Sequence, residues 1–232
     1  MQVPVLNKEG KSVGTLTIDE ASLGGVVNPA LLKQAYVRYH ANKRQGSART
    51  KNRGRVEGST RKLYKQKGTG NARHGDKKSN LFKGGGHGHS KKREREDYRL
   101  SMPKKMRRKA NRNALLAKLV DNEVRVVDGL AFSSPKTRAF EDFLAAVKAD
   151  RSTLVALSME GDLQNAMLSG RNVEEVSLVR CDQLNCFNML NHRFLVIARA
   201  DLESWLKGPT SQTGKEAKIN PLGRTAAAKE AK

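Results

Sequence analysis

The residues of this sequence best suited to chemistry are lysines and arginines, and they are concentrated in one stretch. Residues 43–112 contain 25 basic and five acidic side chains, for a net charge of +20. The whole chain of 232 residues carries +22, so the parts on either side are nearly neutral. A block of positive charge with so little internal counter-charge predicts a polyanionic ligand, and nucleic acid is the leading candidate.

The residue types in this stretch suit RNA. Lysine and arginine neutralise phosphates, and glycine lets a backbone approach a ligand closely because it has no side chain. Tyr64 and Phe82 could stack on unpaired bases, whereas Tyr98 is better placed to anchor the stretch near its end. The alternative is a solvated charged loop without a ligand. The residues predicted to bind RNA are Lys43, Arg44, Gln45, Arg49, Lys51, Arg53, Arg55, Arg61, Lys62, Tyr64, Lys65, Gln66, Lys67, Gly68, Thr69, Gly70, Asn71, Arg73, His74, Gly84, Gly85, Gly86, Lys91, Lys92, Arg93, Lys104, Arg108 and Arg112.

The last three of these residues form a stripe on a predicted helix. Lys104, Arg108 and Arg112 recur every four residues, so they lie on one helical face. Like charges at this spacing destabilise a free helix. The stripe is favourable where phosphates neutralise it.

Nucleotide-binding loops fit the sequence poorly. Gly70 and Gly75 have the spacing of the glycines in a phosphate-binding loop, but Asp76 stands where that motif requires lysine. A dinucleotide fingerprint fails because Arg73 occupies the position of its last glycine. We therefore predict no nucleotide cofactor and no small-molecule substrate.

Metal and catalytic motifs are also weak. His87 with His89, and Cys181 with Cys186 and His192, lack a recognised ligand spacing. The chain contains no G-x-S-x-G or H-E-x-x-H motif. We predict no metal, no catalytic residue and no enzyme activity.

The elements that position the basic stretch follow from hydrophobic patterning. Apolar runs predict strands, and apolar residues at helical spacing predict helices between them. Their alternation predicts a three-layer α/β/α domain with a mainly parallel sheet. Asn28-Pro29 and Ser134-Pro135 are typical of helix starts. The expected strands are 3–6, 15–18, 124–127, 153–157, 173–179 and 194–198, and the expected helices are 29–42, 102–117, 135–147, 163–168, 186–190 and 202–206.

Composition divides the chain into three parts. Residues 1–42 and 100–207 are expected to form the globular α/β domain, and residues 43–99 an extended basic loop inserted in it. Ordering the loop costs about 1 kcal/mol or more per residue, which its six large apolar side chains, at roughly 2–3 kcal/mol each, do not offset. We expect the loop to be disordered until a partner orders it. Residues 208–232 lack periodicity and are expected to form a disordered tail.

Location is indicated by what the sequence lacks. No apolar run approaches the 18 residues of a membrane-spanning helix, and the first residues lack the apolar stretch of a secretory signal. The two cysteines, Cys181 and Cys186, do not form a disulfide framework, which favours a reducing compartment. We expect a cytoplasmic protein without a membrane partner.

Several motifs of the basic stretch resemble a known family. They are residues 42–46, residues 50–53, the long run Lys65-Gln66-Lys67-Gly68-Thr69-Gly70-Asn71-Ala72-Arg73-His74-Gly75, and Gly84-Gly85-Gly86. Over roughly residues 28–206 the chain is similar to the bacterial large-subunit ribosomal protein L-four family. Two departures from the family pattern are His87-Gly88-His89 after the triple glycine and Leu63-Tyr64 in place of proline-tryptophan.

The resemblance implies a fold and a function. It implies an α/β domain in the large ribosomal subunit, with a long loop that threads ribosomal RNA toward the peptide exit tunnel. By this resemblance Arg61 to Thr69 would lie near the tip of the loop, beside another ribosomal protein. It implies a role in subunit assembly, with large-subunit ribosomal RNA and neighbouring ribosomal proteins as partners.

Two other classes of function stay open at this point. A nucleic-acid-acting enzyme on an α/β scaffold would need a cluster of acidic or histidine side chains at the carboxyl ends of strands. Only Asp128 and Asp182 are candidates for such a cluster. A DNA-binding protein is the other class, although the sequence lacks a clear helix-turn-helix or zinc-finger signature.

Overall fold

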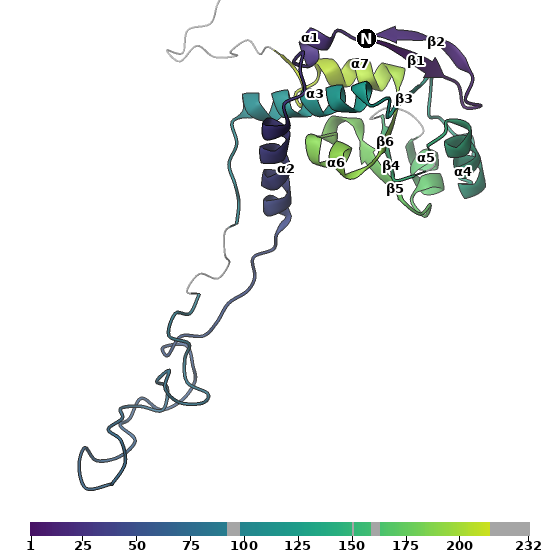
Figure 1. Cartoon of the computed structure of the whole chain (residues 1–232). Coiled ribbons are helices and arrows are strands. Elements are labelled where there is room, and N and C mark those ends of the chain that lie inside the picture. The colour runs from purple at the N-terminus through teal and green to yellow at the C-terminus, as the bar shows by residue number, and fades with distance from the viewer. Residues whose placement is uncertain (92–97, 150, 159–162, 214–232) are drawn as a thin grey trace, which may run out of the picture. The chain divides into compact units, whose positions relative to one another are not determined.

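The computed structural model describes residues 1–91, 98–149, 151–158 and 163–213 (Figure 1). They divide into two compact units. The first unit consists of residues 1–39 together with the described residues from 101 onward, and the second consists of the described residues of 40–100. Lys92 and Arg93, two of the predicted RNA-binding residues, lie outside the described residues.

A sheet forms the centre of the first unit. In the described part of the chain its six strands are β1 (Gln2–Leu6), β2 (Ser12–Thr17), β3 (Val124–Val127), β4 (Thr153–Leu157), β5 (Val176–Arg180) and β6 (Phe194–Ala198). Their order across the sheet is β2-β1-β3-β6-β4-β5. The β1–β2 pair is antiparallel, and all other pairs are parallel.

Helices connect the strands and cover the sheet. They are α1 (Glu20–Leu23), α2 (Pro29–Lys43), α3 (Lys104–Val120), α4 (Thr137–Ala146), α5 (Leu163–Gly170), the 3₁₀ turn η1 (Cys181–Gln183), α6 (Cys186–Asn191) and α7 (Arg199–Lys207). Successive residues of β6 belong to different clusters of buried side chains. Ile197 packs in the cluster that includes α3, and Val196 packs in the cluster that includes α4. The predicted three-layer α/β fold is therefore confirmed.

Several element boundaries agree with the sequence patterns. Strands β3, β4 and β6 have the expected bounds because each is a mostly apolar run, interrupted in β3 by Arg125, that the sheet buries on both faces. Helix α2 begins as expected, since the Asn28 side chain accepts a hydrogen bond of 3.1 Å from the amide of Leu31.

Other boundaries differ for identifiable reasons. Helix α4 was expected to begin at Pro135, but it begins at Thr137, and the amide of Lys136 donates to the Ser169 hydroxyl at 3.1 Å. Strand β5 was expected from Val173, but it begins at Val176. The preceding residue, Glu175, has a φ of 58°, which an extended strand cannot contain.

The start of the expected disordered tail is a further correction. Side chains of α3 bind three successive carbonyls of this segment: Arg108 donates to Pro209 at 2.9 Å, Asn111 to Thr210 at 3.0 Å, and Arg112 to Ser211 at 3.0 Å. The Ser211 side chain is buried and donates to the carbonyl of Trp205. Residues 208–213 are thus part of the first unit, because α3 offers donors that periodicity does not show. Residues 214–232 lie outside the described residues.

The cysteines of the first unit serve packing. Cys181 and Cys186 are buried free thiols, and desolvation raises the pKa of each to about 12. Both therefore stay protonated and unreactive near neutral pH. In the described part of the chain, every helix is too short or too polar to cross a membrane.

Truncation of the chain after Lys207 tests the contacts made by residues 208–213. Three side-chain hydrogen bonds and the burial of Ser211 are lost, so we expect the free energy of unfolding to fall by about 2–3 kcal/mol. Thermal unfolding followed by circular dichroism should then shift down by roughly 5–10 °C. Truncation after Thr213 is the matched control, and a midpoint equally lowered in both variants would contradict the assignment.

Candidate nucleic-acid interface

Main-chain hydrogen bonds organise the second unit. In the part of 40–100 that the structure describes, the only helical residues are the last turn of α2, and the remainder forms turns and extended segments without strands. We call residues 43–99 the insert. The amide of His87 donates to the carbonyl of Lys51 at 2.8 Å, which joins the arm that leaves the first unit to the arm that returns to it. The amide of Leu63 donates to the carbonyl of Gly75 at 3.0 Å and closes a turn of the chain further out.

The two arms also meet where the insert begins and ends. The Asn42 side chain accepts a hydrogen bond of 2.9 Å from the amide of Leu100. The guanidinium of Arg44 lies 3.7 Å from the centre of the half-buried Tyr98 ring, which is a close cation–π contact. These contacts favour the anchoring interpretation of Tyr98.

Positive charge dominates the surface of the insert. Residues 43–91 contain fifteen lysines and arginines and two carboxylates, Glu57 and Asp76. Every one of these cations is exposed except Lys78, which is partly buried. Because two carboxylates can balance only two of the fifteen charges, the insert needs counter-ions from another molecule.

Glycines let segments of the insert approach each other closely. A side-chain carbon built on Gly86 would lie 2.0 Å from the amide nitrogen of Arg53, and one on Gly85 would lie 1.9 Å from the carbonyl oxygen of Ser79. Gly86 is buried. We had expected both glycines to contact RNA, but their lack of a side chain is explained here by packing within the insert.

Aromatic residues of the insert differ in their freedom to stack. The rings of Phe82 and His74 pack edge to face with their centres 4.9 Å apart, so they contact each other. Tyr64 is partly buried, and its hydroxyl donates to the carbonyl of Ala72. Among these three, Tyr64 is the ring that contacts no other aromatic side chain in the described residues.

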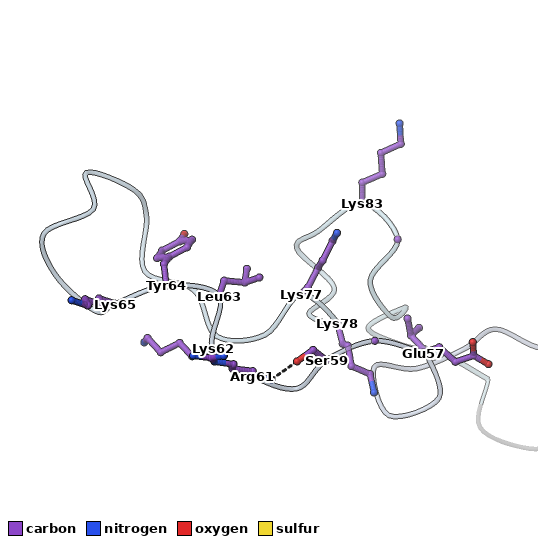
Figure 2. Close-up of a pocket in the computed structure, with 13 residues that line it drawn as sticks. Glu57, Ser59, Arg61, Lys62, Leu63, Tyr64, Lys65, Lys77, Lys78 and Lys83 are labelled. Atoms are coloured by element: carbon purple, nitrogen blue, oxygen red, sulfur yellow. Dashed lines mark hydrogen bonds between the residues drawn. The ribbon is translucent and has the colours of Figure 1, made fainter.

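A cavity of about 930 Å³ lies within the insert (Figure 2). Figure 2 shows residues 61–65 along one side of it, and Lys77, Lys78 and Lys83 come from the returning chain. These three lysines are half of the lining cations, and they were not among the predicted RNA-binding residues because they lie outside the motifs of the basic stretch. The full set of lining cations is Arg61, Lys62, Lys65, Lys77, Lys78 and Lys83.

The sequence model of the Ribosomal protein L4/L1 family matches residues 16–207. The chain belongs to this family. Its relatives include the large ribosomal subunit protein uL4 of Dehalococcoides mccartyi, 41% identical over 197 residues that cover 85% of this chain and 92% of the relative. The proteins of the same name in Symbiobacterium thermophilum and Carboxydothermus hydrogenoformans are 41% and 38% identical, each over 201 residues that cover 85% of this chain and 94% of the relative. The predicted family resemblance is confirmed.

Two residues of the basic stripe on α3 already bind other residues of the same chain. Lys104 is exposed, whereas Arg108 and Arg112 are partly buried and donate to the carbonyls of residues 209 and 211. Burial, together with the neighbouring charge of Arg108, lowers the pKa of Arg112. Phosphates would therefore have to approach these two arginines beside residues that already accept hydrogen bonds from them.

The described residues do not form a phosphate-binding loop, a metal site or a site of paired carboxylates. Residues 67–76 form bends and irregular chain, without the strand and helix that flank a phosphate-binding loop. Among the described residues, no group of three or more His, Cys, Asp or Glu could hold a metal ion. Asp128 follows β3 and Asp182 follows β5, which lie three strand positions apart, or about 14 Å. Those two carboxylates do not form one site.

The motif cations can be tested by replacing Lys65, Lys67 and Arg73 with Ala together. If each side chain contacts a phosphate, the slope of log K against log salt for RNA binding should become shallower by about 2–3. Filter binding to large-subunit ribosomal RNA between 50 and 200 mM salt measures it. The control replaces three exposed cations of the first unit, Lys33, Arg138 and Lys207.

The control variant loses the same charge and should keep the wild-type slope. Equal flattening of the slope in both variants would show a general charge effect rather than phosphate contact at the motif.

Proposed function

We propose that the chain binds large-subunit ribosomal RNA through residues 43–99 and supports assembly of the subunit. Family membership carries the coarser part of this function: the chain is a structural constituent of the large ribosomal subunit, and its role is not enzymatic. The proposed place of action is the cytoplasmic ribosome. The partners are ribosomal RNA and neighbouring ribosomal proteins.

The charge of the insert is the observation that carries the RNA-binding proposal. Fifteen cations and two carboxylates lie on residues 43–91, and nearly all of the cations are exposed. Each phosphate that a cation neutralises releases counter-ions, so binding is strong at low salt and falls steeply as salt rises. Irregular RNA can surround the insert and supply phosphates from several directions.

The outer part of the insert is proposed to reach the wall of the peptide exit tunnel. Residues 61–69 lie in or next to the turn that the Leu63–Gly75 hydrogen bond closes. Gly68 and Gly70 have φ values of 82° and 68°, so the turn depends on glycine at both positions. A neighbouring ribosomal protein at the tunnel constriction is the proposed partner of this segment.

The proposal predicts that RNA binding depends on the insert. In a variant with residues 43–99 replaced by a short Gly-Ser linker, we expect the affinity for large-subunit ribosomal RNA fragments to fall by at least 100-fold at 100 mM salt. The linker can join the ends because the Asn42 side chain and the Leu100 main chain are hydrogen-bonded. A gel shift with purified RNA domains measures the change.

Controls keep this experiment interpretable. Circular dichroism should show that the variant retains the folded first unit, which is a compact unit in itself. Duplex DNA of equal length serves as competitor, and it should displace the structured RNA only weakly. Undiminished RNA binding by the variant, or stronger binding of the wild type to DNA, would contradict the proposal.

A further inference from the structure

The cavity of Figure 2 has walls of two chemical kinds. Val56, Leu63 and Tyr64 contribute apolar surface, and six lysines and arginines contribute positive charge against the single carboxylate of Glu57. A groove that only followed a phosphate backbone would need the cations alone. Apolar and cationic walls together match a nucleotide, which has a flat base and flanking phosphates.

We propose that this cavity receives one unpaired nucleotide of the RNA partner, with its base against Leu63 and Tyr64 and its phosphates on the surrounding lysines. This inference rests on the proposed function, because the nucleotide belongs to RNA that the insert binds. It adds that the insert recognises an unstacked base in addition to phosphates.

Two hydrogen bonds hold the apolar side of the cavity in this structure. The Tyr64 hydroxyl donates to the carbonyl of Ala72, and the Leu63 amide donates to the carbonyl of Gly75. The ring and the side chain beside it therefore lie together on one side of the cavity, where a base can stack on them. Leu63 remains 41% exposed, which is unfavourable for an apolar side chain until something covers it.

The cationic side of the cavity fits the phosphates of the same nucleotide. Lys77, Lys78 and Lys83 come from the returning chain, and residues 61–65 contribute Arg61, Lys62 and Lys65. Cations on both sides of the space can neutralise the phosphates that precede and follow a base. The volume of about 930 Å³ also lies within the range of roughly 300–1,000 Å³ that is typical of ligand sites.

The nucleotide must be unpaired for geometric reasons. In an RNA helix each base is stacked between its neighbours, and its faces are covered. A base in a loop or bulge can be splayed out, and its face then becomes available to an aromatic ring. The cavity should therefore distinguish RNA with a bulged base from fully paired RNA.

A pair of RNA hairpins tests this inference with the full-length protein. One hairpin is fully paired, and the other has a single bulged 2-aminopurine, whose fluorescence falls when it stacks on a ring. We expect the wild-type protein to quench the bulged probe. Tyr64→Ala should weaken binding of the bulged hairpin by about 5- to 100-fold with an unchanged salt slope, and leave the paired hairpin within about threefold.

The matched control is Tyr64→Phe, which keeps the ring and removes only the hydroxyl that bonds Ala72. It should quench the probe and bind within about threefold of wild type. Equal binding of the bulged hairpin by wild type and Tyr64→Ala would overturn the nucleotide site while leaving RNA binding intact. Displacement of the bulged hairpin by 1 mM adenosine monophosphate would overturn it in favour of a free-nucleotide site. Failure of the wild type to bind either hairpin would contradict the proposed function as well.

Discussion

The rest of the structure depends on one electrostatic constraint: the positive charge of the insert exceeds anything the chain can place against it. Residues 43–91 combine fifteen cations with two carboxylates, and they have few apolar side chains to bury. Without a core or internal counter-charge, the insert forms neither strands nor helices beyond the end of α2 in its described residues. Main-chain hydrogen bonds and glycine contacts determine its shape, and its cations remain exposed to a partner.

The α/β unit has the opposite character, and this contrast explains the division of labour. Its sheet buries apolar residues on both faces, and residues 1–39 and 101–232 oppose 26 basic side chains with 18 acidic ones. Polar contacts complete it where helices and strands meet, as at Lys118. The ammonium of Lys118 binds the Glu123 carboxylate at 2.6 Å and the carbonyls of residues 192 and 193. A stable unit of this kind folds without a ligand. It can therefore carry the insert, which needs a ligand to become ordered.

Much of the fold could be predicted because its central strands β3, β4 and β6 are mostly apolar and largely buried. The bounds of β3, β4 and β6 follow from that property alone. The predicted bounds were wrong where a distant contact or a single backbone angle determines the local structure. The Ser169 hydroxyl binds the amide that precedes α4, the φ of Glu175 delays β5, and the α3 side chains bind residues 209–211. None of these contacts leaves a periodic signal.

The candidate site, too, could be predicted only in part. Its cations are visible in the composition, and family resemblance indicates RNA as the partner. The cavity could not be predicted, because it depends on how residues 61–65 and 77–83 return toward each other, and no hydrophobic repeat encodes that path. The packing roles of Gly85 and Gly86 depend on the same path.

Amide hydrogen exchange of residues 43–91 in the full-length protein, free and bound to large-subunit ribosomal RNA, tests the central claim most directly. If phosphates supply the missing counter-charge, these amides should exchange within seconds in the free protein at physiological salt. In the complex they should be protected at least 100-fold, while the strands of the α/β unit stay protected in both states. Strong protection of the insert in the free protein, or none in the complex, would contradict the account.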